Sequence, residues 1–159
     1  MRLIAIFLIA ASLTVAVVGT AQPEILIKVD KSKQRMTVVR DGAAVYNWPV
    51  STGRTGYATP SGSYTTFRME ADHYSKEWDD APMPHSIFFT KIGHAIHGSY
   101  DTKKLGMPAS HGCVRISPAH AATLFALVKQ DGLVKTKVVL TGSEQVALAQ
   151  RGVRVPRSL

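Results

Sequence analysis

The chain has 159 residues, with 19 Lys and Arg against 11 Asp and Glu, a formal net charge of +8, and one cysteine. The basic side chains are scattered, and only Lys103 and Lys104 are adjacent, so the sequence lacks the basic stripe typical of nucleic-acid-binding domains. The lone cysteine excludes a framework of intramolecular disulfides, and the length suits one domain with a buried core.

Residues 1–21 have the pattern of a secretory signal peptide. Arg2 supplies a positive charge, residues 3–18 are uncharged, and Gly19 and Ala21 offer small side chains for cleavage. The alternative is an uncleaved membrane anchor, but the 16 uncharged residues fall short of the roughly 20 that span a bilayer as a helix. We therefore expect an exported protein of the periplasm or cell envelope, attached to the membrane only if this segment is retained.

The following residues alternate between short β-rich runs and turn signals. Strands are predicted at residues 25–29, 35–40, 43–50 and 63–69. Asp41-Gly42 predicts a two-residue hairpin turn between the second and third of these strands. Residues 51–62 are predicted to form a turn-rich loop. Residues 70–84 have no sustained hydrophobic period, which indicates an irregular excursion over the surface.

Further strands are predicted at residues 86–92 and 94–99, followed by one clear helix. Ser117 is a good N-cap, Pro118 fits the first helical position, and Asp131-Gly132 supplies the stop. Its apolar positions recur with helical spacing at Ala121, Leu124, Phe125 and Val128. A last strand at residues 137–141 precedes a basic tail, residues 142–159, with arginines at 151, 154 and 157. The expected fold is mostly β with one main α-helix, in a single domain at residues 22–141.

The only cysteine lies in the stretch SHGCVRIS, residues 110–117. In an exported protein an unpaired cysteine suggests a reactive thiol or an intermolecular disulfide. The alternative is a buried cysteine that acts as a small hydrophobic residue. A nucleophilic thiol needs a base within hydrogen-bond reach and donors for the oxyanion that forms when it attacks a carbonyl.

Two histidines are candidates for the base. His97 lies 16 residues before Cys113, a spacing that lets the chain loop out and return. His111 shares the face of Cys113 on an extended segment, as does Arg115, which could bind a substrate carboxylate. The amides around Gly112 and Cys113 are candidate oxyanion donors. A zinc site through His94 and His97 is the competing interpretation, but no second pair of ligands is evident.

The segment from His97 to Ser117, HGSYDTKKLGMPASHGCVRIS, resembles the signature of the L,D-transpeptidase catalytic domain, or YkuD, family. The stretches at residues 50–66, 81–89 and 137–141 are similar to the family as well. The resemblance implies a β-rich, sandwich-like domain of mixed sheets. It further implies Cys113 as the nucleophile, His97 as general base and acid, and the carbonyl of Gly98 as the group that orients the imidazole.

By the same resemblance, Ser110, His111, Gly112 and Arg115 would shape the oxyanion hole and substrate groove, with no metal or cofactor. The implied substrates are peptidoglycan stem peptides. Cys113 would form a thioester at the third residue of a stem tetrapeptide, typically meso-diaminopimelate, and release D-alanine. A stem amine would then give a 3→3 cross-link, a lysine of a wall-anchored protein would give anchoring, and water would give L,D-carboxypeptidase activity.

Two expectations stay open at this point. The protein could be a catalytically silent wall-binding module, although such a module would require neither Cys113 nor His97. The segment at residues 70–84 is the expected lid, in which Glu77, Asp79 or Asp80 would attract the acceptor ammonium. The alternative for these carboxylates is a solvated acidic loop.

Overall fold

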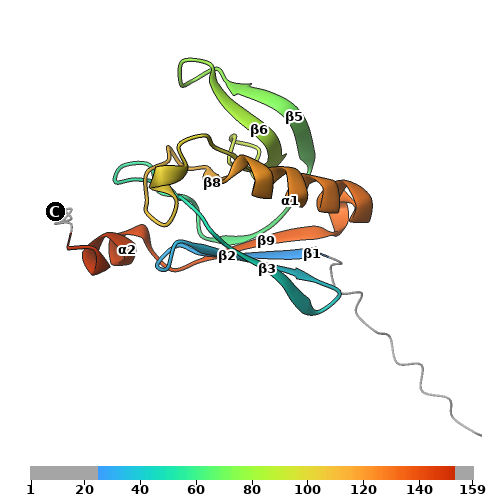
Figure 1. The fold of residues 1–159 in the computed structure, drawn as a ribbon, viewed down its shortest axis with the longest axis horizontal. Coiled ribbons are helices and arrows are strands. Elements are labelled where there is room, and N and C mark those ends of the chain that lie inside the picture. Colours follow the sequence, from blue (N-terminus) through green and yellow to red (C-terminus); the bar gives the residue numbers. More distant parts are fainter. Residues whose placement is uncertain (1–24, 153–159) are drawn as a thin grey trace, which may run out of the picture.

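The computed structural model describes residues 25–152, in which two β-sheets and one long helix surround a main apolar core. The expected signal peptide and the arginines at positions 154 and 157 lie outside the described residues. The core contains buried side chains of both sheets and of the helix. Figure 1 shows the long helix lying across the strands. The two sheets and the helix therefore stabilise one another through a shared interior.

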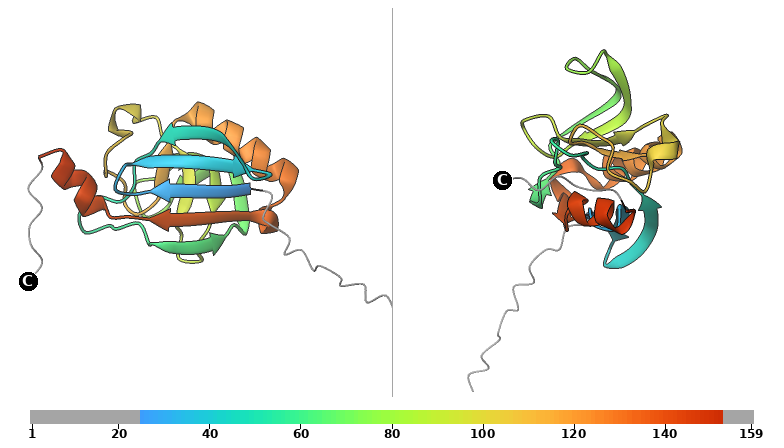
Figure 2. Two further views of the ribbon diagram at one scale, coloured as in Figure 1. Left: turned by 90° about the horizontal axis from the view of Figure 1, so that it is seen from below. Right: turned by 90° about the vertical axis from the view of Figure 1, so that its left-hand side faces the viewer.

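The first sheet has five strands in the order β3-β2-β1-β9-β4 (Figure 2). They are β3 (Ala43–Pro49), β2 (Arg35–Arg40), β1 (Ile25–Asp30), β9 (Thr136–Thr141) and β4 (Gly62–Thr65). Strands β1 and β9 are parallel and the other pairs antiparallel. Asp41 and Gly42 both have positive φ, 50° and 80°, as the predicted tight hairpin turn requires.

The second sheet has four strands in the order β5-β6-β7-β8. They are β5 (Arg68–Ser75), β6 (Ala81–Phe88), β7 (Ala95–Gly98) and β8 (Val114–Ile116). Strands β7 and β8 are parallel, whereas β6 runs antiparallel to both of its neighbours. Both sheets are thus mixed, and the predicted fold class, mostly β with mixed sheets and one main helix, is confirmed.

Helix α1 (Pro118–Asp131) begins and ends where the sequence predicted. The Ser117 hydroxyl accepts the amide of His120 at 3.2 Å, and Gly132 follows the helix with a φ of 104°. Ala121, Leu124 and Val128 are buried. Two short 3-10 helices are η1 (Thr102–Lys104) and η2 (Leu133–Lys135). Within residues 25–152, no helix is long and apolar enough to cross a membrane.

The predicted strand at residues 63–69 is wrong, because two strands of different sheets lie there. Strand β4 ends at Thr65 and β5 begins at Arg68. Between them the buried Thr66 donates its hydroxyl to the carbonyl of Leu133 at 2.7 Å. This hydrogen bond holds the chain at the point where it passes from the first sheet to the second.

Residues 70–84 are not an irregular excursion but the outer part of a long hairpin that projects from the molecule (Figure 1). Strand β6 carries Pro82 and Pro84, which usually argue against a strand inside a sheet. Here both prolines pair only with β5, at Tyr74 and Asp72, whereas β7 pairs with β6 only at Ile87 and Phe88. The hairpin is therefore a two-stranded ribbon in its outer half, where proline and exposed polar side chains are tolerated.

Helix α2 (Glu144–Gln150) lies within the predicted basic tail and carries a buried carboxylate, and its N-cap Ser143 and acidic first turn are signals that the sequence analysis missed. Glu144 pairs with Lys31 at 3.2 Å, and both side chains are 5% exposed. Its second oxygen accepts the amide of Thr59 at 3.1 Å, and Lys31 donates to the carbonyl of Thr59 at 2.6 Å. This buried pair therefore fixes the loop at residues 51–61 to the end of the first sheet.

Glu144→Ala should lower the free energy of unfolding by about 3 kcal/mol, because it leaves the Lys31 ammonium buried without its counter-charge. The measurement is urea unfolding followed by circular dichroism. Lys33→Ala is the matched control, because it breaks the surface pair of Lys33 and Asp30, where the lysine is 75% exposed. The Lys33→Ala substitution should lower the free energy of unfolding by less than about 1 kcal/mol. Equal losses for the two variants would contradict the role of the buried pair.

Candidate active site

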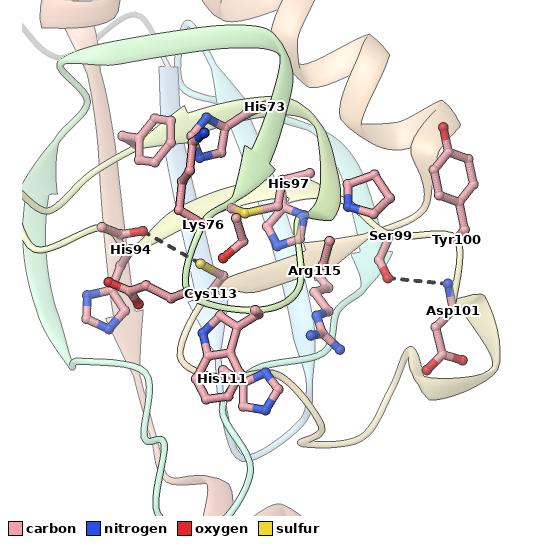
Figure 3. A pocket seen from close by; sticks show the side chains of 18 of the residues that line it. His73, Lys76, His94, His97, Ser99, Tyr100, Asp101, His111, Cys113 and Arg115 are labelled. Atoms are coloured by element: carbon pink, nitrogen blue, oxygen red, sulfur yellow. Dashed lines mark hydrogen bonds between the residues drawn. The ribbon is translucent and has the colours of Figure 1, made fainter.

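A cavity of about 490 Å³ lies beneath the β5–β6 hairpin and brings the predicted thiol and base together (Figure 3). His97 is on β7 and Cys113 immediately precedes β8, the parallel neighbour of β7. The 15 or so residues between them form the crossover that parallel pairing requires. The spacing that the sequence suggested thus follows from the sheet topology, and both side chains line the cavity.

The imidazole of His97 is oriented by its own strand. Nδ1 lies 2.7 Å from the carbonyl oxygen of Gly98. Because a carbonyl can only accept, Nδ1 carries the proton and Nε2 is left with its lone pair. Burial lowers the pKa of His97 to about 4, outweighing the hydrogen bond to Gly98, which raises it. The imidazole is therefore neutral at pH 7 and able to accept a proton.

Cys113 is also held in its neutral form. Burial raises the pKa of the thiol above its ordinary value, and the charge of Glu77 adds to this rise. The amide of Ala95 and the guanidinium of Arg115 oppose it by stabilising the thiolate. The thiol lies 3.8 Å from the carbonyl oxygen of Gly93. The resting site thus contains a thiol and an imidazole rather than an ion pair.

Ser110 and Gly112 shape the turn that presents the thiol. The buried Ser110 donates its hydroxyl to the carbonyl of Cys113 at 2.6 Å and accepts the amide of Gly112 at 3.1 Å. Gly112 has a φ of 113°, and a Cβ there would lie 3.0 Å from Nε2 of His94. Of the two amides that the sequence suggested as oxyanion donors, that of Gly112 is therefore engaged within the turn.

The predicted residues His111 and Arg115 both line the cavity, in different ways. His111 stacks on Trp78 of the hairpin with ring centroids 3.6 Å apart, and Tyr57 meets the imidazole edge-on at 4.9 Å. Its ring thus forms part of the cavity wall. The guanidinium of Arg115 lies close enough to influence both reacting groups, lowering the pKa of Cys113 and of His97.

The turn around Cys113 is supported by the loop at residues 51–54. Ser51 and Arg115 exchange two backbone hydrogen bonds of 2.9 Å, and the carbonyl of Thr52 accepts the amides of both Ala109 and Ser110. The buried Gln34 in turn bonds the backbone and hydroxyl of Thr52 at 2.9 and 2.7 Å. Sequence reasoning missed this support, because nothing local to Gln34 indicates a partner 18 residues away.

Other lining residues were also missed. The cavity is also lined by charged, aromatic and apolar side chains that the sequence analysis did not single out, among them Arg68, Met83, Phe88, Tyr100 and Asp101. Of the three acidic residues expected on the lid, Glu77 lines the cavity, whereas Asp79 and Asp80 do not. Within the described part of the chain, no group of three or more His, Cys, Asp or Glu side chains is arranged to hold a metal ion.

The chain is similar to known proteins over most of its length. The model of the YkuD family, described as the L,D-transpeptidase catalytic domain, matches residues 24–140. YqjB of Bacillus subtilis (strain 168), whose name carries a proposed L,D-transpeptidase activity, is 25% identical over 141 residues, which are 79% of this chain and 78% of YqjB.

Solved structures agree with this match. An L,D-transpeptidase from Stackebrandtia nassauensis has a TM-score of 0.66 and 28% identity, over 78% of this chain and 58% of that one. L,D-transpeptidase 3 from Mycobacterium tuberculosis, in complex with a faropenem-derived adduct, has a TM-score of 0.64 and 23% identity, over 75% of this chain and 60% of that one. The chain thus spans about three fifths of the length of these solved structures.

Arg115→Gln should raise the pKa of Cys113 and that of His97, because the guanidinium charge lowers both. In the unchanged protein, nuclear magnetic resonance should find His97 titrating near pH 4. In the variant its midpoint should lie higher, and alkylation of Cys113 by iodoacetamide at pH 8 should be slower.

Glu77→Gln should change the alkylation rate of Cys113 in the opposite direction. Removing this carboxylate lowers the pKa of Cys113, so alkylation at the same pH should be faster. The electrostatic description of the site fails if the two variants change the alkylation rate in the same direction.

Proposed function

Because the chain belongs to the L,D-transpeptidase catalytic domain (YkuD) family, we propose that it is a peptidoglycan L,D-transpeptidase that acts through Cys113 and His97. One observation carries the assignment of these two residues. The bond from Nδ1 of His97 to the carbonyl of Gly98 leaves Nε2 as an acceptor in the cavity that holds the only cysteine of the chain. This is the logic of a catalytic triad, with a peptide oxygen as the third member.

In the first half-reaction the donor is a stem tetrapeptide. The sulfur of Cys113 attacks the carbonyl carbon of the third residue, and the thiol proton passes to Nε2 of His97. Collapse of the tetrahedral intermediate breaks the peptide bond to the terminal D-alanine, whose nitrogen takes the proton from Nε2. The products are a thioester at Cys113 and free D-alanine, and the thioester keeps the carbonyl activated.

In the second half-reaction a neutral amine attacks the thioester carbonyl and gives its proton to Nε2. The carbon–sulfur bond then breaks, and Cys113 recovers the proton. The side-chain amine of another stem produces a 3→3 cross-link, and a lysine of a wall-anchored protein produces anchoring. Stem peptides lie in the cell envelope, so we propose that the protein works there after export, with residues 1–21 as its signal.

Two other functions fit the same scaffold. Water in place of the amine would make the protein an L,D-carboxypeptidase, and loss of turnover would leave a wall-binding module. The hairpin favours transfer, because Trp78 lines the cavity and stacks on His111, and an aromatic ring at that place limits the access of water to the thioester. The oriented imidazole favours an enzyme over a binding module, because a binding module needs no oriented base.

The test is the intact mass of the purified protein after incubation with a disaccharide tetrapeptide, with its dimer, and with faropenem. Faropenem has a strained β-lactam carbonyl and reports whether Cys113 can be acylated. Tetrapeptide should give an adduct that Cys113→Ala lacks, together with D-alanine and a cross-linked dimer. Acylation of the protein by faropenem but by no stem peptide would contradict the proposed substrate. No adduct from either reagent would contradict Cys113 as the nucleophile.

Glu77→Gln should lower the ratio of cross-linked product to hydrolysed tripeptide, roughly two- to fivefold, because the carboxylate would no longer attract the acceptor ammonium. Chromatography of the products gives the ratio. Asp79→Asn and Asp80→Asn are the matched controls, because these neighbours lie on the same hairpin without lining the cavity. Both have positive φ, near 49° and 48°, a conformation that Asn tolerates. The same ratio in all three variants would contradict an acceptor role for Glu77.

A further inference from the structure

One end of the cavity carries a carboxylate and a guanidinium that neither the motif nor the mechanism uses as a pair. Asp101 and Arg115 both line the cavity, on the side away from His94 (Figure 3). Asp101 lies at the start of the crossover, immediately before η1, and Arg115 lies on β8. Arg115 is therefore held by the β7–β8 pairing, and Asp101 follows the end of β7 by three residues.

Asp101 and Arg115 interact electrostatically but do not form a direct ion pair. Burial lowers the pKa of Arg115, and Asp101 and the thiolate form of Cys113 act in the opposite direction. Among residues 25–152, however, neither Asp101 nor Arg115 forms an ion pair, and the guanidinium donates to the carbonyl of Ala109 at 3.5 Å. Two opposite charges that are not paired with each other therefore line the same cavity, where a ligand with both charges can bind.

The Asp101 carboxylate is also not occupied by the local backbone. An aspartate before a helical turn usually accepts an amide of that turn through its side chain. Here the side chain makes no such bond, and the residue is held instead by its amide, which donates to the Ser99 hydroxyl at 3.3 Å. The backbone is thus fixed while the exposed carboxylate stays available at the rim of the cavity.

We propose that Asp101 and Arg115 bind the free amino-acid end of the donor's third residue, an ammonium and a carboxylate on one carbon. Arg115 pairs with the carboxylate of that end and Asp101 with its ammonium, and both bonds are charge-assisted. The ligand class is a stem whose third residue is a diamino dicarboxylic acid, and lysine at that position supplies only the ammonium. This inference rests on the proposed function.

The substrate bound at the Asp101 end of the cavity is the donor rather than the acceptor. The attacking amine of an acceptor must be neutral and lie at the thioester carbon, next to Cys113. An ammonium paired with Asp101 is held away from the sulfur (Figure 3), so it belongs to a group that does not react. Glu77 approaches Cys113 from the hairpin and remains the carboxylate proposed for the acceptor.

The experiment compares kcat/KM for D-alanine release from three tetrapeptide stems, with meso-diaminopimelate, lysine or norleucine at the third position. Each exposed charge pair should contribute about a fivefold preference. The unchanged protein should thus prefer diaminopimelate to norleucine by about 25-fold, with lysine between them. Asp101→Asn should lower the values for diaminopimelate and lysine by about fivefold and leave norleucine unchanged.

Asp79→Asn is the matched control and should leave all three values unchanged, because Asp79 does not line the cavity. The rate of acylation by faropenem, which has no such amino-acid end, should be the same in Asp101→Asn as in the unchanged protein. Equal use of diaminopimelate and norleucine stems by the unchanged protein would overturn the inference and leave the proposed function standing. An equal loss on all three stems in Asp101→Asn would also overturn it. Reaction with faropenem but with no stem would overturn the proposed function and this inference together.

Discussion

The geometry of the site depends on the backbone hydrogen bonds between residues 51–54 and residues 109–115. Thr52 accepts two amides from the turn before Cys113, and Ser51 exchanges two bonds with Arg115 just after it. The supporting loop is itself fixed by Gln34 and by the buried pair of Lys31 and Glu144. Directional polar contacts, rather than apolar packing alone, therefore determine where the sulfur lies. Such a network specifies one arrangement, because each buried polar atom that lost its partner would destabilise the fold.

The electrostatics of the site favour a resting state without charges on the reacting pair. Burial acts on Cys113 and His97 in opposite directions, raising the pKa of one and lowering that of the other, and both shifts favour the neutral forms. A neutral thiol is a poor target for oxidants, which suits an unpaired cysteine in a protein proposed to work in the cell envelope. In the proposed mechanism the thiolate is needed only when a carbonyl lies against it. Arg115 and the Ala95 amide already stabilise the negative charge at that position.

Local signals were sufficient to predict part of this structure. The turn at Asp41-Gly42 and both ends of α1 depend on residues adjacent in sequence, and these predictions are confirmed. Four of the predicted site residues, His97, His111, Cys113 and Arg115, line one cavity because a parallel strand pair spans the stretch between them, whereas Gly98, Ser110 and Gly112 do not line it. What was missed depends on distant partners. The ribbon of β5 and β6 tolerates prolines only because no third strand covers its outer half, and Glu144 becomes buried only through Lys31.

The contact between Trp78 and His111 ties the tip of the hairpin to the turn that carries Cys113. The hairpin tip touches the opposite wall through ring contacts, Trp78 against His111 and Tyr57. Two aromatic contacts of this kind contribute about 1–3 kcal/mol beyond the area that they bury. Any ligand that must separate these rings to enter the cavity therefore binds more weakly by that free energy.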